Sequence, residues 1–549
     1  MFQDLRYGMR MLRKHPSLSF IAVLTLALGI GANTAIFTVV DAVLLRDLPF
    51  REPERLVQLF RLNPKMAGGS TRLSPADFLA LRDQQRSFSS VATYRIPPEG
   101  FTFLGGERPE QVYGAYVSAE FFQLLGVSPL LGRTFQTGED VANSERMVVI
   151  SYEFWQRHFA GARAILGSKL RLDSDGYTII GVMPQGFWFP RGDRSEFWAN
   201  LRLEPPNRIG PFFYPGLGRL RPGVTLDQAN AELNAITARV REQYPGSTEW
   251  GTISARRLHD HLVADTKPVL WLLLGAVALV LFIACVNVAN LMLARAAARQ
   301  REMAVRLSLG ATRLRLIRQL LSESLLLAGL GAVVGLLLAS WSLSALLALL
   351  PDGLQLLRDA QIEMDARVFA ITALIALGSS LLFGLAPAVI GSRGELARVM
   401  NEAGRSKTDS SSQRRWRGLL VTGEIALSLI LLAGAGLLIR SLINLQAVNP
   451  GVQTKNVLTM FLPAGARYSD DEQLLGFYDR LLERVRALPG VQSAAVSFGL
   501  PPNQLVIGNN FRVVGRPIDP REPEPIADYL SVGDGYFQTL GIPLLQGRA

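Results

Sequence analysis

The stretch VLWLLLGAVALVLFIACVNVANLML, residues 269–293, contains no charged side chain. A helix needs about 20 predominantly apolar residues to cross the hydrocarbon core of a membrane, so this stretch predicts a membrane-spanning helix. Four further apolar stretches meet the same criterion. The five predicted spans are residues 18–45, 269–293, 320–350, 368–390 and 419–440.

The first apolar stretch follows several basic residues and could be read as a secretion signal. However, it is longer than the apolar part of a signal, which has about 7–15 residues, and no small-residue cleavage site follows it. We therefore interpret residues 18–45 as a retained helix.

The composition also points to a membrane protein. Of 549 residues, 49% are hydrophobic and 19% are charged, whereas soluble domains average about 25% charged residues. The single cysteine, Cys285, excludes an internal disulfide. The closest histidine pair, His259 and His261, predicts a solvated turn rather than a metal pair, and we expect no metal site. The net charge of +11 is concentrated beside the apolar stretches, so we expect no nucleic-acid partner.

The positions of arginine and lysine predict the orientation, because short cytoplasmic loops carry an excess of both. The basic segments predicted to be cytoplasmic are residues 1–17, 294–319 and 391–418. The segments predicted to be outside are residues 46–268, the acidic loop 351–367 and residues 445–549. This is a multi-pass arrangement with large domains on the outer side of the membrane.

The outer segments are predicted to be mixed α+β domains. Ser74 followed by Pro75 predicts a helix start, and Thr225 with Gln228 predicts a capping box. The alternating residues 169–181 predict a β-hairpin that turns at Ser174–Gly176.

The two large outer segments share a repeat. Residues 120–133, EFFQLLGVSPLLGR, return as residues 535–548, GYFQTLGIPLLQGR. The predicted helix from Ser74 also has a counterpart in the second segment, which begins at Ser469. We expect this helix to bury Leu474, Leu475, Phe477, Leu481, Leu482 and Val485. We expect the unit of one membrane helix plus one outer domain to occur twice, with residues 445–549 forming only part of the second outer domain.

Motifs that would indicate an enzyme are missing from the sequence. There is no G-x-x-x-x-G-K-[ST] phosphate loop, no G-x-S-x-G elbow, no H-E-x-x-H and no C-x-x-C. We therefore expect a chain that is not itself an enzyme and binds no cofactor.

The basic segment 294–312 is rich in strong helix formers. Glu302 and Arg306 are spaced to pair at i,i+4, and Gly310 predicts a helix stop. A basic loop that only sets the orientation of the chain in the membrane would not need to form a helix with a defined end. We interpret it as a docking helix for a cytoplasmic partner.

This segment resembles the coupling region of the FtsX/MacB-type permeases of ABC transporters. The resemblance rests on Arg301, Glu302, Arg306, Gly310 and Ala311, directly after a membrane helix. Residues 166–172 and 177–190 resemble the MacB periplasmic core signature. Residues 4–10 and 26–37 are similar to those of a duplicated, acidobacterial-type subfamily with eight membrane helices. This chain has five predicted helices, so we expect it to be truncated relative to that pattern.

The resemblance implies a helical membrane protein with MacB-like α+β periplasmic core domains. It implies a permease that transmits ATPase-driven motion across the membrane for efflux or export, with ATP bound by a separate ABC ATPase subunit. Small residues in two spans also predict close helix packing; they are Ala27, Gly31, Gly331 and Gly335.

Other functions remain open at this point. An FtsX-like regulator of outer enzymes, a lipoprotein-release permease and a membrane-anchored binding protein without an ATPase all fit the sequence. The cargo, and the participation of membrane-fusion or outer-membrane components, are equally open.

Overall fold

A computed structural model describes the chain over residues 9–10, 13–14, 16–62, 70–97, 100–106, 108–187, 189–190, 195–244, 251–298, 312–349, 362, 364–392, 411–460, 462, 470–500, 507–511, 513–515 and 526–548. It divides into two compact units. Unit 1 comprises residues 1–46 with 263–446, and unit 2 comprises residues 47–262 with 447–549.

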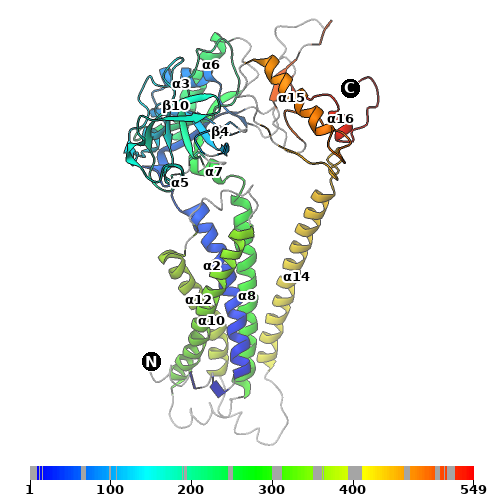
Figure 1. The fold of residues 1–549 in the computed structure, drawn as a ribbon. Coiled ribbons are helices and arrows are strands. Elements are labelled where there is room, and N and C mark those ends of the chain that lie inside the picture. Colours follow the sequence, from blue (N-terminus) through cyan, green and yellow to red (C-terminus); the bar gives the residue numbers. More distant parts are fainter. Residues whose placement is uncertain are drawn as a thin grey trace, which may run out of the picture. The chain divides into compact units, whose positions relative to one another are not determined.

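Unit 1 is helical (Figure 1). Among its described residues, five helices are long and apolar enough to cross a membrane. They are α2 (Pro16–Val40), which continues into the π-helical turn η1 (Asp41–Leu45), α8 (Lys267–Ala298), α10 (Arg313–Leu349), α12 (Ala366–Ser392) and α14 (Ser411–Ala447).

Four of these helices form a bundle. α2 packs against α8, α10 and α12, and α12 also packs against α8 and α10. Apolar side chains of all four helices fill the interior, including Leu26, Val288, Leu327 and Phe383. The apolar window of α14, in contrast, has no buried residue.

The helices extend beyond the apolar stretches that predict them. α8 continues to Ala298 and α10 already begins at Arg313. Both ends of the predicted coupling segment 294–319 are therefore continuous with membrane helices, and its middle, residues 299–311, lies outside the described residues.

Residues 47–262 of unit 2 form an α+β domain around a 13-stranded sheet. The strands are β1 (Leu56–Leu62), β2 (Ser70–Thr71), β3 (Phe88–Arg95), β4 (Phe101–Phe103), β5 (Glu110–Val112), β6 (Gly114–Val117), β7 (Leu131–Gly132), β8 (Met147–Ile150), β9 (Lys169–Leu172), β10 (Asp175–Val182), β11 (Phe197–Asn200), β12 (Gly216–Leu220) and β13 (Thr252–Arg257).

The main path of the sheet runs β13-β1-β12-β3-β6-β11-β8-β10-β9-β4-β5, with β2 on β1 and β7 on β10. Most neighbours are antiparallel, but β6 with β11 and β8 with β10 are parallel. The helices of this domain are α3 (Pro75–Gln84), α4 (Phe121–Leu125), α5 (Tyr152–Phe159), α6 (Leu226–Gln243) and α7 (Leu258–Val263), with 3-10 turns at Pro53–Arg55 and Arg163–Ile165. The predicted fold class, a helical membrane protein with an α+β outer domain, is confirmed.

The predicted helix starts of α3 and α6 are confirmed. Ser74 caps α3 and forms a capping box with Asp77, and Thr225 does the same for α6 with Gln228. Apolar residues of both helices then pack on β1, β3, β12 and β13 in one core cluster, among them Phe78, Leu81, Leu233 and Ile236.

Two local predictions were wrong in detail. The β9–β10 hairpin pairs Leu172 with Asp175, so the turn lies at residues 173–174, one position earlier than predicted. Asp173 takes the left-handed conformation there, with φ of 55°, which aspartate tolerates better than most residues. The predicted turn at His259 and His261 is the short helix α7, where His261 stacks on Phe60 with ring centroids 6.0 Å apart.

Residues 447–548 contain α15 (Asp471–Arg486), the hairpin of β14 (Ile507–Asn510) and β15 (Ile526–Tyr529), and α16 (Tyr536–Thr539). The N-cap of α15 is Asp470, whereas the sequence predicted Ser469. The predicted burial of one α15 face, Leu474, Leu475, Phe477, Leu481, Leu482 and Val485, was wrong, because no α15 residue is buried and Leu475 is 65% exposed. Among the described residues, too little of the chain packs on this helix to cover its apolar side.

Candidate functional site

The membrane bundle is centred on a close contact between α2 and α10. A Cβ atom on Gly31 would lie 2.8 Å from the carbonyl oxygen of Gly335, and one on Gly335 would lie 3.0 Å from the Ala27 oxygen. A Cβ atom on Gly331 would lie 2.8 Å from the Cβ of Leu26. The structure thus brings together the four small residues singled out in the sequence, with backbone against backbone.

A second contact joins α2 to α8. The Asn33 side-chain amide donates to the Val277 carbonyl at 2.7 Å and to the Gly29 carbonyl of its own helix at 2.9 Å. Asn33 is 5% exposed. A Cβ atom on Gly29 would lie 3.0 Å from the Leu281 side chain. An amide in an apolar bundle needs such acceptors, because an unsatisfied polar group is costly there.

A third contact joins α2 to α12. The hydroxyls of Thr34 and Thr372 are hydrogen-bonded at 3.1 Å, and both residues are at most 2% exposed. These polar contacts were missed at the level of sequence, where Asn33 and Thr34 are only interruptions of an apolar stretch. The spacing of Thr34 and Thr38 on one helical face is the signal that could have indicated a packed side.

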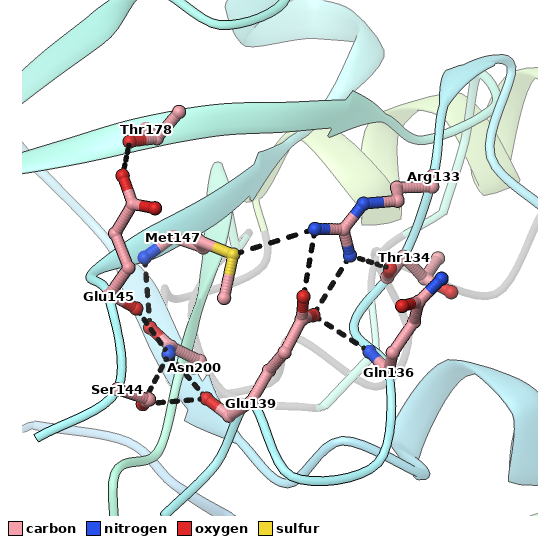
Figure 2. Close-up of polar contacts among 9 residues, drawn as sticks. All are labelled: Arg133, Thr134, Gln136, Glu139, Ser144, Glu145, Met147, Thr178 and Asn200. Atoms are coloured by element: carbon pink, nitrogen blue, oxygen red, sulfur yellow. Dashed lines mark hydrogen bonds and ion pairs between the residues drawn. The ribbon is translucent and has the colours of Figure 1, made fainter. Parts of the chain in front are cut away.

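The outer domain holds a polar network around the repeated motif (Figure 2). Both terminal nitrogens of Arg133 donate to the Glu139 carboxylate at 2.8 Å, and the backbone N–H of Gln136 donates to the same carboxylate at 2.8 Å. Gly132, just before Arg133, has φ of 72°, and a Cβ atom there would lie 2.2 Å from the Ile180 oxygen. The motif therefore fixes the loop that follows β7.

Asn200 closes the other side of that loop (Figure 2). Its amide nitrogen donates to the carbonyls of Glu139 and Glu145 at 2.6 and 2.8 Å, and its oxygen accepts from the Met147 N–H at 3.0 Å. Asn200 is 1% exposed. Asn200 thus ties the segment around Glu139 and Glu145 to the start of β8.

The predicted coupling residues Arg301, Glu302, Arg306, Gly310 and Ala311 lie outside the described residues. In the part of the chain that the structure describes, no group of three or more His, Cys, Asp or Glu side chains is placed to hold a metal ion. The described contacts of the bundle fix one helix, α2, to three others by glycine contacts and buried hydrogen bonds.

Two parts of the chain match known protein families. Residues 19–236 match the model of the MacB-like periplasmic core domain, and residues 274–396 match that of the FtsX-like permease C-terminal region. Together the two matches cover more than half of the chain.

Relatives of known name are similar at low identity. The macrolide export ATP-binding/permease protein MacB of Agrobacterium fabrum is 26% identical over 66% of this chain and 53% of its own length. The protein of the same name from Hahella chejuensis is 26% identical over 50% of this chain and 40% of its own length. The chain thus spans about half the length of the curated relatives it matches. The periplasmic region of MacB from Actinobacillus actinomycetemcomitans aligns with 39% of this chain and 92% of its own, at 17% identity and a TM-score of 0.29.

These observations define a multi-pass membrane protein of the permease class with an α+β periplasmic domain. Both matched regions are permease domains. The chain carries the two domains that are typical of FtsX/MacB-type permeases, a MacB-like periplasmic core domain in residues 19–236 and an FtsX-like permease C-terminal region in residues 274–396.

Proposed function

We propose that this chain is the subunit that carries ATPase-driven motion across the membrane and uses it for export from the outer side. ATP would be bound and hydrolysed by an ABC ATPase partner. The chain itself would bind no cofactor.

The packing of α2 carries this proposal. α2 contacts α8, α10 and α12 through Gly31, Asn33 and Thr34, so a displacement of one helix is passed to the others. The chain leaves the bundle for the outer domain directly after η1, at Asp47, and returns just before α8, at Val263. Packed helices with continuous connections are suited to transmit movement.

The cytoplasmic contact is proposed to lie in residues 301–311, between α8 and α10. There Arg301 and Arg306 would bind acidic groups of the ATPase, Glu302 would orient Arg306, and Gly310 with Ala311 would end the docking helix. Because this segment is attached to both α8 and α10, movement of the ATPase would reach the bundle at two helices.

The docking role is tested by Glu302→Lys in the full chain. A charge mismatch in a docked interface costs several kcal/mol, whereas like charges at i,i+4 cost an exposed helix only some tenths of a kcal/mol. We expect normal amounts of protein in the membrane but at least a tenfold loss of the ATPase partner that co-purifies with the chain. Gln300→Lys, which also adds positive charge to this segment, is the control and should retain the partner. Unchanged ATPase association in Glu302→Lys would refute docking through this segment.

Export is tested separately. The relatives named above are macrolide export proteins, so a macrolide is the first cargo to measure, in cells with and without the chain. A complex that keeps its ATPase but exports none of a panel of macrolides, peptides and lipoproteins would favour a regulator of outer enzymes over an exporter.

A further inference from the structure

The outer end of α2 has an unusual backbone. The five residues that follow α2, Asp41–Leu45, form the π-helical turn η1. A hydrogen bond from the Arg46 N–H to the Asp41 carbonyl at 2.8 Å closes this turn. A π-turn holds one residue more than an α-turn and occurs mostly as a single turn, frequently at functional sites. The residue next along the chain, Asp47, begins unit 2.

Asp41 is buried in apolar surroundings. It is 3% exposed, and the neighbouring residues Val40 and Val43 belong to a core cluster with Leu270 of α8 and Leu343 of α10. Within the described part of the chain, Oδ2 of Asp41 accepts no hydrogen bond. A buried carboxylate oxygen without a hydrogen bond is costly, so this position favours the approach of a donor.

Arg46 contacts both Asp41 and Asp365. A terminal nitrogen of Arg46 forms an ion pair with Oδ2 of Asp41 at 3.5 Å, but it donates a hydrogen bond to Oδ2 of Asp365 at 2.9 Å. Asp365 directly precedes α12, so Arg46 ties the end of α2 to the start of α12. The Arg46 side chain is 34% exposed.

Asp365 does not depend on Arg46 to stay charged. Its Oδ1 accepts the backbone N–H groups of Arg367 at 3.0 Å and Val368 at 3.1 Å. These bonds, that of Val368 first, together with the positive charge of Arg46, hold the pKa of Asp365 below its usual value. If Arg46 moved away, the Asp365 carboxylate would still accept the N–H groups at the start of α12 and would remain partly in water. If Arg46 moved closer to Asp41, it would donate a hydrogen bond to a buried oxygen.

We propose that Asp41, Arg46 and Asp365 form a two-position latch at the outer end of the bundle. In the position seen here, Arg46 holds α2 to α12. In the other position, Arg46 binds Asp41 within its own turn, and α2 is released from α12. A change of the π-turn to an α-turn would accompany the exchange, because removing one residue from the turn rotates the following residue by about 100°.

The latch would set whether α2 moves with α12 or independently of it when the outer domain moves. That consequence rests on the proposed function. The exchange itself does not, since it concerns only the chain's own side chains.

The experiment measures the separation of the two helix ends directly. Spin labels are attached at Leu45 and Phe369, which are 50% and 52% exposed, in the full chain with Cys285→Ala in lipid nanodiscs. Dipolar broadening in continuous-wave electron paramagnetic resonance reports the fraction of close pairs. No ATPase is added, so failure of the coupling proposal leaves this result unaffected.

Replacing the two carboxylates should change the fraction of close pairs differently. Asp365→Asn removes the charge that holds Arg46 on α12, so the close fraction should fall at least twofold. Asp41→Asn removes the alternative position, so the close fraction should be equal to or above that of the parent. Asp265→Asn, near the outer start of α8 and outside the triad, is the control and should match the parent.

Any other pattern overturns the latch. An unchanged close fraction in Asp365→Asn would show that the ion pair does not hold the helices together. A fall in both Asp365→Asn and Asp41→Asn would show a static triad that needs all its members. Circular dichroism and gel filtration identify a variant that is misfolded; for such a variant, Asp365→Ser or Asp41→Ser is measured in its place against the same criteria.

Discussion

Arg61 and Asp77 form an ion pair from which water is excluded. Nε of Arg61 donates to the Asp77 carboxylate at 2.8 Å, a terminal nitrogen donates to the other oxygen, and both side chains are 0% exposed. Asp77 also accepts the backbone N–H of Ser74 at 3.0 Å. One carboxylate therefore joins strand β1 to the first turn of α3.

Breaking this pair should strongly destabilise the outer domain. Asp77→Asn removes the negative charge of a buried ion pair, and breaking such a pair typically costs about 3–5 kcal/mol. Urea unfolding of the full chain, followed by tryptophan fluorescence, measures the change. The control is Lys169→Ala, because Lys169 and Glu145 form an exposed pair, 58% and 63% exposed, worth at most about 1 kcal/mol. Equal losses in the two variants would contradict the role of burial.

Adding a methyl group at the glycine contact between α2 and α10 should destabilise the bundle. Gly335→Ala places a methyl group 3.0 Å from the Ala27 oxygen and the Gly31 nitrogen, and overpacking of this kind costs about 1–3 kcal/mol. Gly329→Ala in the same helix is the matched control, since nothing lies within 4 Å of its Cβ position. The buried thiol of Cys285, 3% exposed, reports unfolding through its reaction with a thiol-reactive dye on heating. Identical melting temperatures of the two variants would show that α2 and α10 accommodate the added methyl group without loss of stability.

The stability of the outer domain should fall in mildly acidic solution through His158. Burial, and then the nearby Arg157, lower the pKa of His158 from its usual 6.5, against the opposing effect of Glu110 and Glu196. The folded state thus favours the neutral ring, whose Nε2 accepts from Arg157 Nε at 3.0 Å. The contribution is fully present above about pH 6.5 and is lost as the pH falls below that value.

His158→Gln tests this dependence. The variant keeps an acceptor for Arg157 but has no titration in this range, so its free energy of unfolding should change less between pH 7.5 and 5.5 than that of the parent. An identical pH dependence in both proteins would assign the loss to other groups.

Trypsin should cleave residues 447–549 at least tenfold faster than residues 47–262. Among the described residues after 446, the buried apolar side chains are Tyr536 and Leu540, whereas three core clusters fill the first outer domain. Cleavage at Arg484 near the end of α15 can be compared with cleavage at Arg241 near the end of α6, by mass spectrometry of the full chain in nanodiscs. Similar rates would show that α15 is as well protected as α6.

Local features of the fold could be predicted from sequence because their causes are local. The cap at Ser74 needs only the three residues that follow it, and the apolar length of residues 269–293 by itself predicts a membrane helix. The face of α15 shows the limit of such reasoning. Its apolar stripe indicates a side that could be buried, but not whether another element covers it.

The bundle contacts depend on helices far apart in the chain. The small residues of α2 predicted close packing, but not that Gly31 meets Gly335, because helical periodicity defines a face and not its partner. The partner of Thr34 was even harder to predict. Its hydroxyl already donates a hydrogen bond to the Ile30 carbonyl of its own helix at 2.8 Å, so there was no reason in the sequence to expect a further partner such as Thr372.

The position of β13 at one end of the sheet has a consequence for crowded membranes. An edge strand exposes backbone groups that can pair with another chain, and membrane insertion confines the outer domains of neighbouring copies to one side of the membrane. Such confinement raises their effective concentration far above that of freely diffusing domains. The last two residues of β13, Arg256 and Arg257, are both exposed, so two copies that met along this edge would bring four like charges together. Repulsion between these arginines therefore disfavours the joining of sheets from neighbouring copies.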